Sequence, residues 1–137
     1  MTAGFLDTNI LLYSISRAPA EKAKRERAIA LLEEDDWSLS AQVLQEFYVQ
    51  ATRPSRADAL PHDIAAGLVR AWQRFRVQDI TPALVNAALD IKSRYGFSYW
   101  DAAIVAAALA QGRARLYSED LSHGQIVEGL QIVDPFR

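Results

Sequence analysis

The sequence contains no cysteine, only two histidines and a single methionine in its 137 residues. Without cysteine, the chain has no disulfides, no catalytic thiolate and no zinc site built on cysteine. It also lacks an apolar run of the roughly 18 residues that a membrane-spanning helix needs. No basic stretch leads into an apolar one near its start. We therefore expect a cytoplasmic protein without a membrane partner, built as one domain over residues 1–137.

Charge of either sign is also modest. Lysine and arginine number 15 against 17 acidic residues, which gives a net charge of −2 and a pI of about 5.6. This balance argues mildly against a nucleic-acid partner, because such proteins are often basic. However, a bound divalent metal would offset part of the acidic charge. The cations gather at residues 17–27 and 53–76, where arginine suits phosphate contacts as well as an ordinary surface helix.

Several common phosphate-handling motifs are missing. No Gly-x-x-x-x-Gly-Lys-[Ser/Thr] loop is present, and no Gly-x-Gly-x-x-Gly follows the first apolar run, so P-loop and dinucleotide-binding folds are unsupported. A phosphate-accepting receiver domain would need a lysine late in the chain, but the last one is Lys92. A haloacid-dehalogenase-type phosphatase would need an aspartate two residues after Asp7, where this chain has Asn9.

Short apolar runs alternate with helical periodicity along the chain. We predict strands at residues 4–6, 37–40, around 77, 115–117 and 130–133. Helices are predicted to start at residue 10 and to cover 19 to about 34, 41–51, 62–75, 82–95 and 98–112. Such alternation indicates right-handed crossovers and therefore an α/β fold, with a short, mostly parallel central sheet flanked by helices on both faces.

Apolar positions in these helices predict which side chains are buried. We place Ile64, Val85 and Leu89 on inner helix faces. The three tryptophans also lie in apolar patterns, and all are predicted to be core residues: Trp37, Trp72 and Trp100.

Four acidic segments stand out because each lies at the edge of an apolar run. They supply Asp7, Glu46, Asp101 and the adjacent pair Glu119 and Asp120. In a parallel sheet the carboxyl ends of the strands share one edge, so segments far apart in sequence can gather there. Carboxylate oxygens in a chain without cysteine suit Mg²⁺ or Mn²⁺. Without the ion, repulsion among clustered carboxylates would raise some of their pKa values.

Each carboxylate also has an ordinary structural explanation. Asp7 could cap the helix that follows it, and Asp101 stands at the third helical position of a capping box. Glu46 could be a boundary residue paired with an arginine, and Glu119 and Asp120 could be turn residues. The functional hypothesis therefore rests on the joint placement of the acids and not on any single one.

Other polar residues are weaker candidates. Thr8, Asn9 and Ser118 could donate hydrogen bonds to site carboxylates or to a metal-bound water, or could serve only as turn and cap residues. The two histidines, His62 and His123, could in principle form an acid–base pair for metal-free RNA cleavage. Both lie in polar, loop-like segments, so we do not favour this pair.

Four segments resemble the motifs of one known family. Leu6-Asp7-Thr8-Asn9 matches its opening motif, Gln45-Glu46-Phe47 its second acid, and Trp100-Asp101-Ala102-Ala103-Ile104 its third. Ser118-Glu119-Asp120-Leu121 resembles its closing pattern, which maps the fourth acid to Asp120 with Glu119 as an adjacent substitute. On these residues the chain is similar, over essentially its whole length, to PIN-domain proteins, and specifically to VapC-type toxins of bacterial toxin–antitoxin pairs.

The resemblance implies a metal-dependent endoribonuclease of the bacterial cytoplasm, commonly a homodimer that a small antitoxin protein holds inactive. It would hydrolyse RNA phosphodiesters with a metal-activated water. The implied catalytic residues and ligands of Mg²⁺ or Mn²⁺ are Asp7, Glu46, Asp101 and Asp120, supported by Thr8, Asn9, Ser118 and Glu119. Two alternatives remain open: a catalytically silent PIN-like module that binds RNA or protein, and a Mg²⁺-dependent phosphatase.

Overall fold

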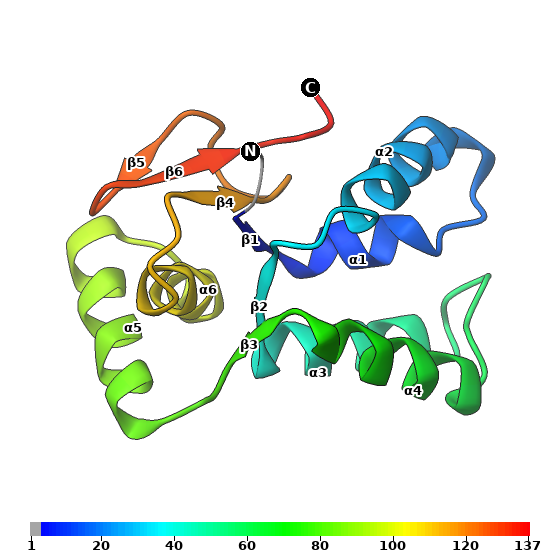
Figure 1. Ribbon diagram of the computed structural model, residues 1–137, viewed down its shortest axis with the longest axis horizontal. Helices are drawn as coiled ribbons and strands as arrows, with labels where there is room; N and C mark the ends of the chain where they lie inside the picture. Colours follow the sequence, from blue (N-terminus) through cyan, green and yellow to red (C-terminus); the bar gives the residue numbers. More distant parts are fainter. Residues whose placement is uncertain (1–3) are drawn as a thin grey trace.

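The computed structural model describes residues 4–137, which form one six-stranded sheet (Figure 1). Its strands are β1 (Phe5–Leu6), β2 (Ser38–Ser40), β3 (Arg76–Gln78), β4 (Arg115–Tyr117), β5 (Ile126–Val127) and β6 (Leu130–Val133). The spatial order is β3-β2-β1-β4-β6-β5. Neighbouring strands pair in parallel except for β5 and β6 at one edge. The sequence did not predict β5, because Ile126 and Val127 stand between the polar residues Gln125 and Glu128 and show neither a longer apolar run nor an alternating pattern.

Within residues 4–137, six α-helices accompany the sheet. They are α1 (Thr8–Ser14), α2 (Lys22–Leu32), α3 (Ala41–Ala51), α4 (His62–Ala71), α5 (Pro82–Tyr95) and α6 (Tyr99–Ala110). Two 3₁₀ turns, η1 (Pro19–Glu21) and η2 (Trp72–Arg74), precede α2 and follow α4. Figure 1 shows α5 and α6 on one side of the sheet and α1 to α4 on the other, so the α/β prediction is confirmed. None of these helices is long and apolar enough to cross a membrane.

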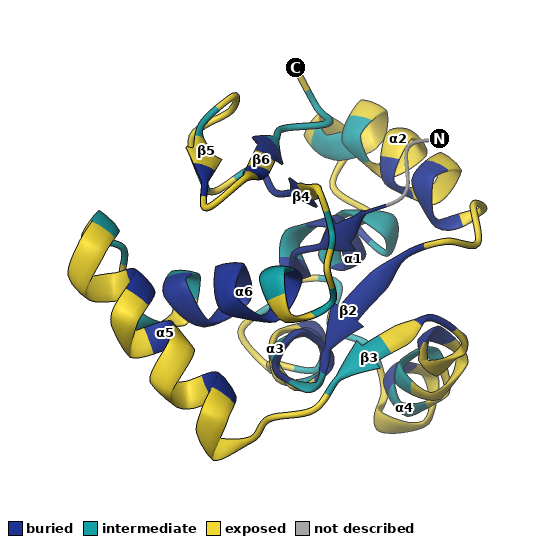
Figure 2. Ribbon diagram, turned by 60° about the vertical axis from the view of Figure 1, so that its left-hand side comes forward, coloured by how far each residue is buried: buried dark blue, intermediate teal, exposed yellow. Residues whose placement is uncertain are grey.

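Helix α6 forms the centre of one layer. Its residues from Ala102 to Ala108 are all buried, and Figure 2 shows the helix between α5 and the sheet. Most of these residues are alanines, whose small side chains allow close packing against both neighbours. The outward face of α5 is exposed, so α5 closes this side of the molecule (Figure 2).

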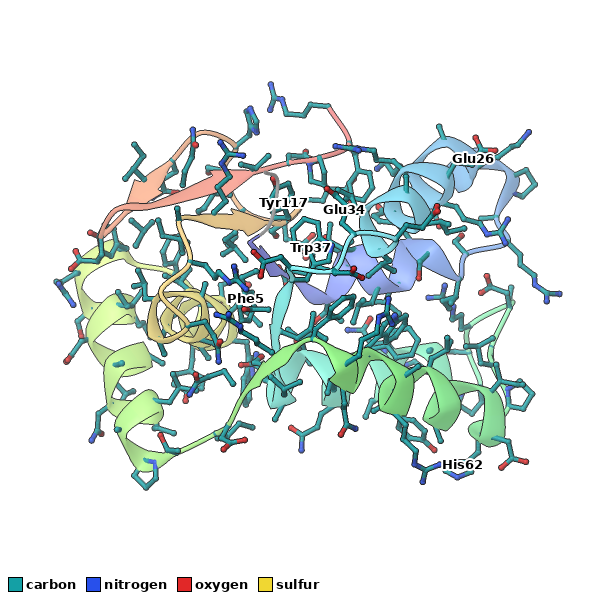
Figure 3. All side chains as sticks on the ribbon, in the orientation of Figure 1. Phe5, Glu26, Glu34, Trp37, His62 and Tyr117 are labelled. Atoms are coloured by element: carbon teal, nitrogen blue, oxygen red, sulfur yellow. The ribbon has the colours of Figure 1, made fainter. Side chains whose placement is uncertain are left out.

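Trp37 connects the end of α2 to the hydrophobic core. Its side chain is 1% exposed and packs edge-on against Tyr117, with the ring centroids 5.0 Å apart (Figure 3). The indole N–H donates to the Leu31 carbonyl at 2.7 Å, which gives the buried ring the hydrogen-bond partner it needs. Trp72 is also buried, as predicted.

Several predicted inward positions are wrong. Ile64, Val85 and Leu89 are 55%, 36% and 49% exposed, and Trp100 is 62% exposed. Helical periodicity identifies an apolar stripe, but a helix at the edge of a layer buries only the part of the stripe that meets a neighbour. The helix predicted over residues 62–75 also ends earlier, because α4 passes into the 3₁₀ turn η2.

The register of the central strands brings their carboxyl ends to one edge of the sheet. Phe5 pairs with Leu116, and Leu6 pairs with Tyr117. The Asp7 N–H then donates to the Tyr117 carbonyl at 3.0 Å, and Ser118 follows directly. Asp7 and Ser118 therefore extend from adjacent strand ends, although they are 111 positions apart in the sequence.

Candidate active site

The four predicted acids line one cavity at the carboxyl edge of the sheet, with a volume of about 330 Å³. Asp7 follows β1, Glu46 lies on α3, Asp101 lies in the first turn of α6, and Asp120 follows β4. The other lining residues are Thr8, Asn9, Leu12, Tyr13, Glu21, Gln50, Arg56, Trp100, Ile104 and Glu119. Four separate parts of the chain thus present carboxylates to one space.

Asp7 is the buried member of the cluster, with 5% of its surface exposed. Its Oδ1 accepts the Thr8 N–H and its Oδ2 accepts the Ser118 hydroxyl, both at 2.7 Å. Burial raises the pKa of Asp7 to about 7; these two hydrogen bonds lower it in part, and the charges of Asp120 and Glu46 raise it further. Carboxylate repulsion therefore contributes as expected, but desolvation is the main cause. Asp7 also caps α1, so its structural and site roles coincide.

Glu46 is held in place by Thr8. The Thr8 hydroxyl donates to Glu46 Oε1 at 2.8 Å, which joins the start of α1 to the middle of α3. Helix α3 begins at the cap Ser40, whose hydroxyl accepts the Val43 N–H at 3.2 Å. Among the ion pairs of the described residues, none joins Glu46 to an arginine. The boundary ion pair considered from the sequence is therefore not formed.

Asp101 is positioned by the cap of α6. The Asp101 N–H donates to the Ser98 hydroxyl oxygen at 3.2 Å, as one half of a capping box requires. The reciprocal bond, from the Ser98 N–H to the Asp101 carboxylate, is absent from the hydrogen bonds of residues 4–137. The carboxylate therefore remains available to the cavity.

Asn9 couples the loop after β4 to the start of α1. Its Nδ2 donates to Asp120 Oδ2 at 3.1 Å, and its Oδ1 accepts the Glu119 N–H at 3.3 Å. Ser118 Oγ accepts the Asp120 N–H at 3.1 Å while its hydroxyl donates to Asp7. Asn9 and Ser118 thus fix Asp120 relative to Asp7.

Glu119 has a different set of partners. Lys24 of α2 forms an ion pair with its carboxylate, and the Tyr13 hydroxyl donates to the same group. Burial raises the pKa of Glu119, but hydrogen bonds from Lys24 and Tyr13 outweigh this effect and hold it below the usual value. Because its charge is already paired, these contacts favour Asp120 over Glu119 as the fourth acid.

The donor set fits a hard divalent cation, although the carboxylates as placed do not form a closed ligand cage. In residues 4–137, no group of three or more His, Asp or Glu side chains is close enough to hold one ion. Mg²⁺ commonly keeps several waters and binds only one or two carboxylates directly, so acids spread around a cavity remain compatible with it. The buried Asp7 carboxylate is the group whose charged form a cation would stabilise most.

Some cavity residues were not predicted from the sequence. Tyr13, Glu21 and Arg56 line the cavity, and Lys24 pairs with Glu119 beside it. No local motif marks these residues, because the lining residues reach the cavity from three separate segments: α1, η1 and the loop after α3. The only available signal was that Lys24 and Arg56 belong to the two basic clusters.

The histidines have other contacts. His62 Nδ1 lies 2.8 Å from the Tyr48 hydroxyl, and His123 Nδ1 accepts the Asp134 N–H at 2.9 Å. Neither is among the described residues that line the acidic cavity, and Figure 3 shows His62 at the outer end of α4. A metal-free pair of histidines is therefore unsupported.

Ser118→Ala is expected to slow any reaction at this cavity by about ten- to a hundredfold, the usual cost of removing a group that orients a site carboxylate. The Ser118 hydroxyl lowers the pKa of Asp7, so its loss should also move the acidic limb of the pH–rate profile to higher pH. Ser122→Ala, an exposed position in the same loop, is the matched control. An unchanged rate and profile would show that Ser118 does not position Asp7.

Comparisons with known proteins agree with this architecture. The model of the PIN domain family matches residues 4–127. A toxin–antitoxin complex from Klebsiella pneumoniae aligns with a TM-score of 0.72 and 20% identity, over 96% of this chain and 97% of that one. VapC20 from Mycobacterium tuberculosis, a toxin that cleaves the sarcin–ricin loop, aligns with a TM-score of 0.66 and 21% identity, over 84% and 87%. FitAcB from Neisseria gonorrhoeae aligns with a TM-score of 0.65 and 16% identity, over 96% of this chain and 97% of that one. No curated protein matches the chain.

Proposed function

The chain belongs to the PIN domain family, and we propose that it is a metal-dependent endoribonuclease, the toxin of a bacterial toxin–antitoxin pair. One observation carries the proposal: Asp7, Glu46, Asp101 and Asp120 line one cavity, and Asp7 is buried with its pKa raised to about 7. Strongly perturbed carboxylates in a cavity are typical of functional sites. A toxin of the same fold cleaves the sarcin–ricin loop, which supports RNA as the substrate.

The four acids of the cavity would hold Mg²⁺ or Mn²⁺, partly through water. When bound, the ion supplies positive charge to the phosphate oxygens and lowers the pKa of a water. The chain supplies the positioning. The Thr8 hydroxyl orients Glu46, and the Ser118 hydroxyl and the Thr8 N–H orient Asp7.

Asp101 or Asp120 would act as the general base. Among the described residues, the Asp101 carboxylate accepts no hydrogen bond and the Asp120 carboxylate accepts one, from Asn9. Either group can therefore take the proton of the water that attacks phosphorus. The bond to the 3′ oxygen then breaks and that oxygen gains a proton, so the products carry a 5′-phosphate and a 3′-hydroxyl.

The test is an RNA cleavage assay with structured and single-stranded RNAs in Mg²⁺ or Mn²⁺, beside an EDTA control. We expect metal-dependent cleavage with 5′-phosphate ends. Asp101→Asn should slow it by about a hundredfold or more, the usual cost of removing a proton-transfer group. Asp90→Asn, an exposed aspartate on α5, is the control for charge.

Each other outcome has its own meaning. Ends with 2′,3′-cyclic phosphate would exclude this mechanism. Hydrolysis of a chromogenic phosphate ester without RNA cleavage would indicate a phosphatase. Calorimetric binding of Mn²⁺ without turnover of either substrate would indicate a silent binding module.

We also propose a small antitoxin and a second copy of the chain as partners. The support for the antitoxin is that toxin–antitoxin complexes share this fold across nearly the whole chain. The second copy rests on the resemblance to VapC-type toxins, which are commonly homodimers. An arginine of the antitoxin placed in the acidic cavity would bind a carboxylate through two parallel hydrogen bonds. Addition of the correct antitoxin should therefore stop RNA cleavage, and sedimentation velocity measures the oligomeric state.

A further inference from the structure

Trp100 exposes a large apolar ring beside the acidic cavity. It is 62% exposed, whereas Trp37 and Trp72 are 1% and 5% exposed. The Gln42 side chain donates to the Trp100 carbonyl at 3.3 Å, and the indole packs edge-on against Tyr99 at 5.1 Å. These contacts hold the backbone and one ring edge but leave the ring largely uncovered. An indole left in water gains little hydrophobic stabilisation, so its position next to Asp101 in the chain indicates a binding role.

A second cavity adjoins the acidic one at Trp100. It has a volume of about 320 Å³ and is lined by Gln42, Gln45, Glu46, Val49, Gln50, Arg53 and Trp100. Three of these residues, Glu46, Gln50 and Trp100, also line the acidic cavity. The two spaces therefore form one groove, which runs from the carboxylates between α3 and the indole of Trp100.

Two arginines lie along this groove. Arg56 is the one basic side chain that lines the acidic cavity within the described chain, and Arg53 lines the adjoining cavity. Arg56 is fixed by an ion pair with Asp58, with Nε 2.7 Å from Oδ1, while Arg53 has no ion-pair partner among residues 4–137. An unpaired arginine beside an exposed indole fits an anion that also carries an aromatic ring. A nucleotide has both features.

We propose that Trp100 and Arg53 form a subsite for one unpaired nucleotide next to the scissile phosphate. The base stacks on Trp100, and Arg53 binds a backbone phosphate on that side of the cut. Only an unpaired base exposes a face for stacking, so the subsite directs cleavage to unpaired segments. The inference rests on the proposed function in so far as the ligand is RNA. An apolar protein partner would leave the charge of Arg53 uncompensated, which is why the groove favours RNA.

Binding is measured with the full chain and hexauridylate, with Ca²⁺ replacing Mg²⁺ to separate binding from cleavage. Trp100 is the one exposed tryptophan of the three, so stacking should quench the fluorescence of the native protein and leave Trp100→Phe without this signal. Measured by anisotropy of labelled RNA, Trp100→Ala should weaken binding by about tenfold or more, and Trp100→Phe should retain most of it.

Arg53→Gln tests the phosphate contact. It should weaken binding of all sequences and reduce the slope of log affinity against log salt by about 0.7 for a single strand. Arg115→Gln, an exposed arginine at the opposite end of β4, should change neither.

The outcomes separate the subsite from the proposed function. RNA cleavage by the native protein with unchanged binding and cleavage by Trp100→Ala would overturn the subsite alone. Another result would be that RNA quenches the native protein and Trp100→Ala loses binding, but the native protein does not cut RNA in Mg²⁺. This result would support the subsite and contradict the nuclease. A shift of Trp100→Ala from dimer to monomer in sedimentation, with unchanged RNA affinity, would assign the indole to a protein interface and overturn the subsite. A native protein that neither binds nor cuts RNA would overturn both.

Discussion

Asp7→Asn is expected to stabilise the folded protein at about pH 8 and to slow RNA cleavage by about a hundredfold or more. Burial raises the pKa of the Asp7 carboxyl from 3.8 to about 7. Between these values the folded state binds a proton that the unfolded state has released, so stability falls as the pH rises through this window. Above about pH 7, the ionised, buried carboxylate lowers the free energy of unfolding by about 4 kcal/mol at most. Asparagine carries no charge and can still cap α1, so it avoids this cost.

The measurement is urea unfolding in EDTA at about pH 5 and pH 8, together with the cleavage rate in Mg²⁺. We expect a gain of about 2–4 kcal/mol at the higher pH and of about 1–2 kcal/mol at the lower one, where native Asp7 is largely protonated but the unfolded chain has already released its proton. Cleavage should fall by about a hundredfold or more. Asp90→Asn, exposed on α5, should change stability by less than about 0.5 kcal/mol at either pH. An equal gain at both pH values would show that Asp7 is not the titrating group.

The affinity for Mn²⁺ is expected to rise about tenfold per pH unit from pH 5 to 7, and to level off above that range. A carboxylate must lose its proton before it can bind a cation, and the pKa of Asp7 is raised to about 7. Below that pH, the ion must displace the proton, so the affinity for Mn²⁺ falls about tenfold for each unit by which the pH decreases. Binding should therefore release close to one proton per ion in the acidic range and almost none at higher pH.

Calorimetry in two buffers of different ionisation enthalpy measures both the affinity and the released protons. Ser118→Ala removes a hydrogen bond that lowers the pKa of Asp7. The Mn²⁺ affinity of this variant should therefore level off at a higher pH than that of the native protein. Ser122→Ala should follow the native protein. A constant Mn²⁺ affinity across the range would mean that Asp7 is ionised throughout or takes no part in binding.

The order of helices and strands could be predicted because local patterns encode it. The helices after Ser40, Thr81 and Ser98 each begin where a hydroxyl caps the first turn, and Gly96 ends α5 in the left-handed conformation that glycine favours. The two-residue strand β5 carries no such pattern. It forms because β6 offers it a partner, which is a property of the sheet and not of the segment.

The acids of the candidate site could also be predicted, since each stands at the edge of an apolar run. Their partners could not. The sequence offered an arginine for Glu46, but the structure gives it the hydroxyl of Thr8. It left Glu119 and Asp120 as alternatives, and the contact of Glu119 with Lys24, which favours Asp120, depends on how α2 packs. The apolar setting of Trp100 predicted that it is buried. Periodicity could not show that no neighbouring element covers this side chain.

By itself the sequence determined the α/β alternation, the caps that start the helices and the carboxylates beside the strand ends. These depend on hydrogen bonds and apolar spacing within a few residues. The tertiary structure alone decided that Asp7 is desolvated, that Asn9 binds Asp120 from 111 positions away, and that Trp100 faces a groove. Such features depend on the register of β1 against β4 and on which helix faces are covered. They arise only when distant segments pack, so no local pattern in the chain can encode them.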